Sequence, residues 1–132
     1  MISEKSSGTK AKILIVDDEV DIAELVAEFL EVNYQVVMAN NVTEACAKIS
    51  ENQFDIIVTD LHLPDCRGQS SVCHLRKTHF AGPILLVTGQ DEFDPKVKQA
   101  LADGAQGLVK KPFTLESFEQ TIFNALNVKK AG

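Results

Sequence analysis

The chain has 132 residues, of which 45% are hydrophobic and 24% charged, values that fit one globular domain and exclude a largely disordered chain. Its 19 acidic and 13 basic residues give a formal net charge of −6, which opposes a protein that grips nucleic-acid phosphates. Trp is absent and only 6% of residues are aromatic, which disfavours single-strand binding by base stacking. The apolar runs are too short to span a membrane and the start lacks a signal-peptide core, so we expect a cytoplasmic protein without membrane contact.

Apolar runs and helical periodicity alternate along the first half of the chain. Residues 1–11 are polar and aperiodic, which predicts a flexible lead. Strands are predicted over Lys12–Val16, Tyr34–Ala39 and Asp55–Thr59. A helix is predicted over Glu19–Val32, because apolar residues recur there with helical spacing at Ile22, Leu25, Val26, Phe29 and Leu30. Asn41 and Glu44 have the spacing of a capping box at the start of a second helix.

The second half repeats the same alternation. A less regular helix is predicted over Gln69–Phe80, with Val72, Leu75 and His79 on one side. Gly82 and Pro83 precede a strand over Ile84–Val87, and Asp94 with Pro95 predicts the start of a helix that ends near Gly104. A short strand over Gly107–Lys110 follows. Thr114 is predicted to cap a last helix that ends at about Val128, before a tail over 129–132.

The three cysteines indicate a reducing compartment, because they are odd in number and follow no disulfide framework. Cys46 is predicted to be a small buried thiol on its helix. Four potential metal ligands crowd one stretch, namely His62, Cys66, Cys73 and His74, but their spacing matches no paired zinc pattern.

Five strands that alternate with five helices predict a single α/β domain over 12–128, built as a (βα)5 unit. The apolar runs of the first, third and fourth strands lack alternation, as expected when helices cover both faces of a parallel sheet. We therefore expect three layers around an open sheet, because a closed barrel would need eight such units.

Polar side chains follow the strands at the edge of the sheet where ligands bind in such folds. Asp17 and Asp18 follow the first strand, Asp60 the third, Thr88 the fourth and Lys111 the fifth. Each residue alone has an ordinary explanation, such as a helix-end charge or a solvated side chain. Together they bring three carboxylates, a hydroxyl and an ammonium to one place.

Three adjacent carboxylates repel one another, and a divalent cation with hard oxygen ligands resolves that repulsion, so the sequence predicts a Mg²⁺ site. The same residues fit a phosphoryl acceptor, with a carboxylate as nucleophile. Lys111 would place a positive charge on one phosphoryl oxygen and Thr88 a hydroxyl on another, and the absence of a side chain at Gly89 leaves the approach open.

These residues, in this order, resemble a response-regulator receiver domain of two-component signalling (CheY-like). The resemblance is carried by Val16-Asp17-Asp18-Glu19, by Asp60 with Pro64 and Gly68, by Val87-Thr88-Gly89 and by Lys111-Pro112-Phe113. It covers about 12–128 and implies a flavodoxin-like fold with strand order 2-1-3-4-5.

The resemblance also implies the roles of the site residues. Asp60 would accept a phosphoryl group from the phosphohistidine of a histidine kinase or a phosphotransfer protein. Lys111 would be the lysine of the family's site, and its peptide bond to Pro112 would be cis. Asp17, Asp18 and Asp60 would bind Mg²⁺ together with the backbone carbonyl of His62. The protein would catalyse only its own phosphorylation and dephosphorylation, and dimerisation on phosphorylation stays an open outcome.

Other positions concern the lifetime and the reading of the phosphorylated state. His62 and Gln90 stand two residues after Asp60 and Thr88, where the resemblance implies control of hydrolysis. Leu108 occupies a position where the family usually has Tyr or Phe. The implied partner surface includes Lys96, Lys98 and Gln99. Phe123 is either a half-buried edge of its helix or an exposed contact for a partner, because it lies about 100° from Ile122 around the helix.

Several alternatives stay open at this point. A flavin carrier is disfavoured because Asp17 and Asp18 would repel a phosphate, and a haloacid-type phosphatase because His62 stands where its second aspartate belongs. A docking module that needs no phosphorylation is disfavoured by the complete acceptor set. The chain could also be the receiver of a larger DNA-binding regulator or of a hybrid histidine kinase. Its start at Met1 favours an N-terminal or separate receiver over the kinase.

Overall fold

A computed structural model describes residues 10–131, with the side chains of residues 10–127. Most of the predicted flexible lead, residues 1–9, and the last residue of the predicted tail lie outside the described part. In the described part, no helix is both long enough and apolar enough to cross a bilayer.

The centre of the fold is a five-stranded sheet with the order β2-β1-β3-β4-β5, and every neighbouring pair is parallel. The strands are β1 (Lys12–Val16), β2 (Gln35–Ala39), β3 (Ile56–Asp60), β4 (Ile84–Thr88) and β5 (Gly107–Lys110). All residues of β3 and β4 are buried, which explains their uninterrupted apolar runs. The predicted flavodoxin-like order is confirmed.

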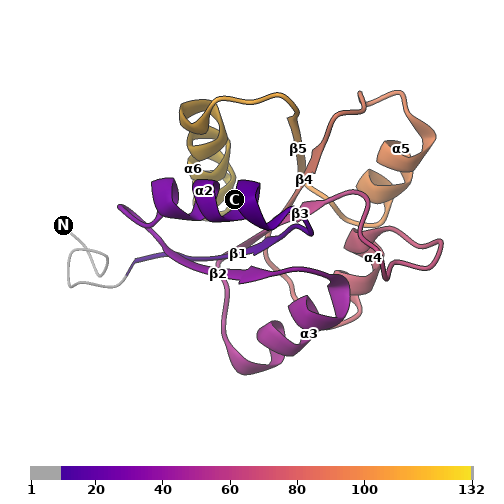
Figure 1. Ribbon diagram of the computed structural model, residues 1–132, viewed down its shortest axis with the longest axis horizontal. Helices are drawn as coiled ribbons and strands as arrows, with labels where there is room; N and C mark the ends of the chain where they lie inside the picture. Colours follow the sequence, from indigo (N-terminus) through magenta and orange to yellow (C-terminus); the bar gives the residue numbers. More distant parts are fainter. Residues whose placement is uncertain (1–9, 132) are drawn as a thin grey trace.

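Helices cover both faces of this sheet (Figure 1). On one face lie α2 (Val20–Leu30) and α6 (Leu115–Ala131), whose inward residues, among them Val26, Leu30, Phe118 and Ile122, form one apolar cluster with the sheet. On the other face lie α3 (Val42–Glu51), α4 (Ser71–Arg76) and α5 (Pro95–Ala102). The predicted three-layer architecture is therefore confirmed.

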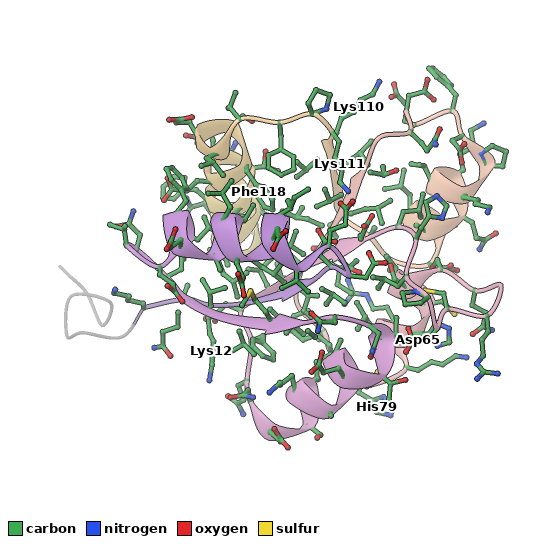
Figure 2. All side chains as sticks on the ribbon, in the orientation of Figure 1. Lys12, Asp65, His79, Lys110, Lys111 and Phe118 are labelled. Atoms are coloured by element: carbon green, nitrogen blue, oxygen red, sulfur yellow. The ribbon has the colours of Figure 1, made fainter. Side chains whose placement is uncertain are left out.

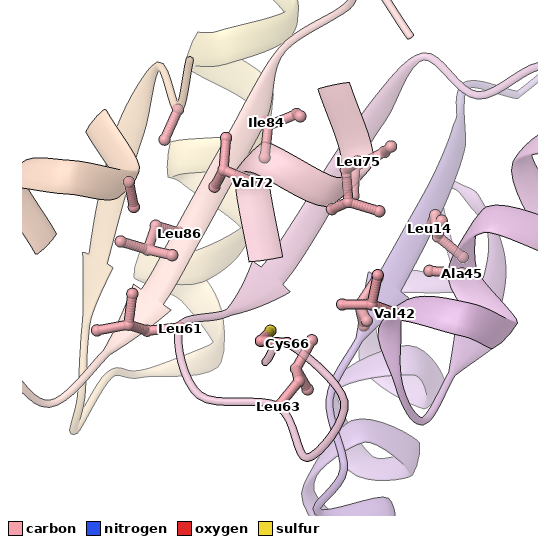
Figure 3. Close-up of a cluster of buried hydrophobic side chains, with 14 of the residues drawn as sticks. Leu14, Val42, Ala45, Leu61, Leu63, Cys66, Val72, Leu75, Ile84 and Leu86 are labelled. Atoms are coloured by element: carbon pink, nitrogen blue, oxygen red, sulfur yellow. The ribbon is translucent and has the colours of Figure 1, made fainter. Parts of the chain in front are cut away.

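The loop between β3 and α4 belongs to the second apolar cluster. Leu61, Leu63 and Cys66 are buried against residues of α3, α4 and the sheet (Figure 3). This packing fixes the loop that directly follows Asp60. Cys66 is therefore a buried thiol in this region, whereas Cys46, which we expected in the core, is only half-buried and packs against the cluster from its edge.

The predicted N-caps of three helices are confirmed. The Asn41 side chain accepts a hydrogen bond from Glu44 N at 2.7 Å, and Asp94 accepts one from Lys96 N at 2.8 Å. Thr114 Oγ1 accepts one from Ser117 N at 3.0 Å. The Glu44 carboxylate reaches back to Asn40 N at 2.6 Å, one residue earlier than in the usual capping box.

The start of α3 has a second cap that comes from a distant loop. One Asp65 oxygen accepts from Val42 N at 2.9 Å, and the other from Thr43 N at 2.9 Å and Thr43 Oγ1 at 2.7 Å. Asp65 lies beside this end of α3 in Figure 2. The bonds attach the β3–α4 loop to the neighbouring helix.

Two predicted helices have different boundaries in the structure. The prediction over Gln69–Phe80 is too long, because α4 ends at Arg76 and His79 takes a positive φ of 70°, which a helix does not allow. The last helix continues to Ala131, past the predicted end at Val128. The first helix is shorter than Glu19–Val32, since Glu19 is its N-cap and Glu31 its C-cap.

The apolar face of α2 also differs from the prediction. Ala23, Val26, Ala27 and Leu30 are buried, but Ile22 is 41% exposed and Leu25 56% exposed. Small alanines let α2 approach the sheet closely, which leaves Ile22 and Leu25 on its flank. The sequence pattern therefore identified an apolar face wider than the face that the sheet covers.

Candidate functional site

Buried polar side chains gather at the carboxyl ends of three neighbouring strands. In the described part of the chain, the buried polar residues are Asp17, Thr59, Asp60, Ser71 and Thr88. Asp17 follows β1, Thr59 and Asp60 end β3, and Thr88 ends β4. Because these strands are adjacent and parallel, their ends meet at one edge of the sheet. The predicted convergence is therefore present.

Three carboxylates form the acidic part of this site. Asp17, Asp18 and Asp60 each offer an oxygen, and the three oxygens lie within 4.8 Å of one another. Asp17 and Asp60 are buried whereas Asp18 is exposed, so the cluster is open to solvent on one side. Hard oxygen donors in a partly open cluster are the ligands that Mg²⁺ prefers. The residues present therefore fit the predicted metal.

Burial makes this cluster unfavourable when all of its groups are charged. Desolvation raises the pKa of Asp60 above the ordinary aspartate value, and the charge of Asp18 adds to that rise. Opposing effects come from Lys111 and from the backbone N–H groups of Leu61 and His62. Desolvation also raises the pKa of Asp17, and the bond from Glu19 N to Asp17 Oδ1 at 2.9 Å opposes it. A cation would relieve both penalties.

Lys111 places its ammonium group beside the buried carboxylate. Its Nζ lies 3.6 Å from Asp60 Oδ2 and 3.7 Å from Glu19 Oε1. Its backbone N donates to Thr88 O at 2.8 Å, which continues the β4–β5 pairing by one residue. The peptide to Pro112 is cis, as the resemblance implied. Figure 2 shows Lys111 reaching from the end of β5 toward carboxylate oxygens, whereas its neighbour Lys110 is exposed.

Thr88 offers a hydroxyl at the end of β4. Its side chain is buried, and its Oγ1 accepts a hydrogen bond from Gln90 N at 3.1 Å. This bond uses an oxygen lone pair and leaves the hydroxyl proton available for a ligand. A Cβ at Gly89 would meet no atom within 4 Å, so the space next to Thr88 is open.

The backbone of Asp60 is held by two buried hydroxyls that the sequence did not reveal. Ser71 Oγ donates to Asp60 O at 2.8 Å, and Thr59 Oγ1 donates to the same oxygen at 3.0 Å. Ser71 opens α4, eleven residues beyond Asp60. A serine at the start of a helix is usually a cap, and nothing in its sequence position indicates this contact. Glu19 belongs to the motif that follows β1, but its ion pair with Lys111 was likewise not predicted.

The remaining predicted residues lie outside this constellation. The side chains of His62 and Gln90 are exposed, and the backbone N–H groups of these two residues contact Asp60 and Thr88. Leu108 is half-buried and packs against the cluster under α3, α4 and α5. Lys96 and Gln99 border a separate pocket on α5, and Lys98 is exposed. Phe123 on α6 is 52% exposed, so it is not a core residue.

Among the described residues, the four potential ligands His62, Cys66, Cys73 and His74 form no metal-ligand cluster. The Asp17, Asp18 and Asp60 group is the metal-ligand cluster found among the described residues. His74 instead donates from Nε2 to Cys66 O at 2.7 Å, which ties α4 to the loop before it.

Comparison with known proteins decides the family. The family described as "Response regulator receiver domain" matches residues 13–123. The chain belongs to the response regulator receiver family. Receivers act in two-component signalling, where a phosphoacceptor role and an acidic Mg²⁺ pocket are typical.

Individual relatives agree with this assignment. The response regulator protein PilR of Pseudomonas aeruginosa is 33% identical over 92% of this chain and 27% of its own length. The regulatory protein VanRc of Enterococcus gallinarum is 40% identical over 77% of this chain and 44% of its own length. The chemotaxis protein CheY4 of Vibrio cholerae has a similar structure, with a TM-score of 0.77, 32% identity and coverage of 89% of this chain and 99% of that one.

The receiver also occurs inside larger proteins of different kinds. The hybrid signal transduction histidine kinase D of Dictyostelium discoideum is 31% identical over 98% of this chain and 8% of its own length. The chain spans about half or less of the length of the curated relatives it matches.

Proposed function

We propose that Asp60 accepts a phosphoryl group from the phosphohistidine of a histidine kinase or a phosphotransfer protein, and that the phosphorylated state changes how the receiver docks to a downstream protein. The observation that carries this proposal is the 3.6 Å approach of Lys111 Nζ to Asp60 Oδ2, next to the Asp17 and Asp18 carboxylates. A nucleophile, a fixed cation and hard anionic ligands are the components that phosphoryl transfer needs.

The transfer step is a displacement at phosphorus. A carboxylate oxygen of Asp60 forms a bond to the phosphorus while the P–N bond to the imidazole breaks, and the electron pair of that bond stays on the imidazole nitrogen. The N–H of Leu61 donates to Asp60 Oδ1 at 2.8 Å and so holds the carboxylate in one orientation. Lys111 and the Thr88 hydroxyl then stabilise the charge on the transferred phosphoryl oxygens.

We assign the metal ligands to Asp17, Asp18 and Asp60, together with the backbone carbonyl of His62. Mg²⁺ bound there would supply neutralisation of charge on the phosphoryl oxygens. His62 and Gln90 flank the opening and would set how readily water reaches the acyl phosphate. In this account the protein catalyses only reactions of its own phosphoryl group.

The exposed flank of α2 supports docking of the phosphodonor beside the site. Ile22 borders the same depression as Asp17 and Asp60, and Leu25 continues this apolar flank by one helical turn. A donor helix that covers these residues would bring its phosphohistidine close to Asp60 and exclude water from it.

Intact-mass measurement with phosphoramidate, whose P–N bond resembles that of phosphohistidine, tests the proposal. The native protein should gain one HPO3 group in the presence of Mg²⁺ and none after chelation. Asp60→Asn should gain none, whereas Asp65→Asn, the same change five residues further along the loop, should behave like the native protein. A native protein that gains no Mg²⁺-dependent group would refute the proposal.

A further inference from the structure

A second pocket lies beside the phosphoacceptor site, between the β3–α4 loop and α5. It has a volume of about 250 Å³. Its apolar lining comes from Leu61, Leu63 and Cys66, and its polar rim includes Arg67 and Lys96. The volume is below the lower end of small-molecule sites, ~300 Å³, and suits the insertion of a single apolar side chain.

The rim of this pocket is positively charged in a protein whose net charge is −6. Arg67 and Lys96 are exposed, and neither takes part in the ion pairs found among the described residues. No carboxylate from the described part of the chain lines the pocket. Two acids next to lining residues are engaged elsewhere, because Asp65 caps α3 and Asp103 accepts bonds from Ser70 Oγ at 2.7 Å and Gln99 Nε2 at 3.0 Å. The pocket therefore complements an acidic partner.

The walls of the pocket are bonded directly to Asp60. Leu61 lines the pocket, and its backbone N donates to Asp60 Oδ1 at 2.8 Å. Ser70 also lines it, and the adjacent Ser71 donates to Asp60 O at 2.8 Å. Ser70 in turn holds Asp103 at the end of α5. The Asp60 carboxylate is thus one hydrogen bond away from the loop wall. The backbone carbonyl of Asp60 is connected to the α5 wall through Ser71, Ser70 and Asp103.

We propose that this pocket is a docking site for a partner-protein segment in which an apolar side chain is flanked by carboxylates, and that its affinity responds to phosphorylation of Asp60. The apolar side chain would enter the pocket and the carboxylates would pair with Arg67 and Lys96. The apolar lining and the acidic net charge favour a protein segment over nucleic acid. The dependence on phosphorylation rests on the proposed function, whereas docking itself does not.

The sides of α5 provide a matched control for the experiment. Residues 96 and 99 line the pocket, and the buried residues Val97 and Ala100 face the core. At about 100° per residue, Lys98 projects from the opposite flank of the helix. Lys98→Glu therefore makes the same charge change as Lys96→Glu on the same helix, away from the pocket.

Titration followed by amide chemical shifts tests the docking. The probe is the octapeptide Gly-Asp-Asp-Leu-Phe-Glu-Glu-Gly, with a peptide bearing Lys in place of every acidic residue as comparison. The acidic peptide should shift resonances of residues 61–70 and 96–99 saturably. Lys96→Glu and Arg67→Glu should each weaken it about fivefold or more, and Lys98→Glu less than about twofold. Equal weakening by Lys98→Glu, equal binding of the basic peptide, tighter binding of a single-stranded oligonucleotide at these residues, or no saturable shift would overturn the docking site.

Repeating the titration after treatment with phosphoramidate and Mg²⁺ tests the dependence on Asp60. The affinity should change about fivefold or more in protein whose intact mass shows the phosphoryl group, and should not change in Asp60→Asn. An unchanged affinity in phosphorylated protein would overturn the coupling alone. Failure to incorporate the phosphoryl group would overturn the proposed function and the coupling with it, while the docking site is decided by the untreated protein.

Discussion

Lys111 Nζ lies 3.6 Å from Asp60 Oδ2, and this approach joins the end of β5 to the end of β3 across the intervening strand β4. The Lys111 side chain is 28% exposed, so water reaches its ammonium group and weakens the attraction between Lys111 and Asp60. In the proposed function, the same ammonium serves two carboxylates before transfer and a phosphoryl oxygen after it.

Lys111→Met should slow the Mg²⁺-dependent phosphorylation of the protein by about 100-fold, the usual cost of removing one donor to a developing negative charge. The three aspartates are unchanged, so Mg²⁺ binding should persist, as measured by titration. Lys110→Met is the matched control, because it removes the adjacent, exposed lysine that ends β5. Similar rates for the two variants would contradict the role of Lys111.

Magnesium should stabilise the protein more at pH 8 than at pH 5. Burial raises the pKa of Asp17 and Asp60, so the folded protein favours their protonated forms. In the metal-free protein, ionisation of these two carboxylates lowers the free energy of unfolding. This loss of stability is absent below the ordinary aspartate pKa and grows as the pH rises through the folded pKa values. Melting temperatures at both pH values, with and without MgCl₂, measure the effect.

Asp17→Asn controls that measurement. The variant should melt at a higher temperature than the native protein without metal, because it removes one of the mutually repelling carboxylates, and its response to Mg²⁺ should be lost. A Mg²⁺ effect of equal size at both pH values, or one retained by the variant, would count against the acidic cluster as the metal site.

Asp65→Ala should lower the free energy of unfolding by about 1 kcal/mol, the usual contribution of a helix cap. Partial burial tends to raise the pKa of Asp65, but the hydrogen bonds from Val42 and Thr43 outweigh it and lower that pKa. The carboxylate therefore stabilises the fold above the ordinary aspartate pKa, and this contribution is lost as the pH falls through the lower, folded pKa. Urea unfolding at pH 7 and pH 3 should show the difference between variant and native protein shrinking in acid.

A double-mutant cycle with Thr43→Val separates this cap from general effects of substitution. The two changes should be less than additive, because both remove the bond from Thr43 Oγ1 to Asp65. Glu92→Ala, which removes an exposed acid from the loop before α5, should leave stability unchanged within about 0.5 kcal/mol. Strict additivity would contradict the observed contact.

Arg76→Met should destabilise the fold by about 2–4 kcal/mol, since it leaves buried or half-buried carbonyls without their donors. The Arg76 guanidinium donates to the carbonyls of Phe80, Gly82 and Gly104, each at 2.8 Å, and so joins the end of α4 to the loop after α5. Arg67→Met, a change of the same kind at an exposed arginine, should have little effect in the same urea experiment. Equal losses for the two variants would show that the three carbonyl bonds are not what stabilises this corner.

The sheet and the ends of its strands were predictable from the sequence because two strong signals coincide there. The apolar runs of β1, β3 and β4 identify buried strands, and the parallel topology that follows puts Asp17, Asp60 and Thr88 at one edge. The caps at Asn41 and Asp94 were predictable for a similar reason, since they depend on residues two or three positions apart.

The contacts that support the site were not predictable, because they join residues that no local pattern connects. Ser71 reaches Asp60 across eleven positions, and Asp65 reaches Thr43 across twenty-two. The end of α4 depends on Arg76 turning toward three distant carbonyls and on the left-handed conformation of His79. The exposure of Leu25 depends on how closely α2 approaches the sheet, which helical periodicity does not report.

Chemical mapping of the phosphorylated residue tests the central claim most directly. Borohydride reduction of protein treated with phosphoramidate and Mg²⁺, followed by proteolysis and peptide mass analysis, locates the acyl phosphate because only that group is reduced. We predict a single modified residue, Asp60, and no modification in the presence of a chelator. Modification of Asp17, Asp18 or another acid in place of Asp60 would contradict the account.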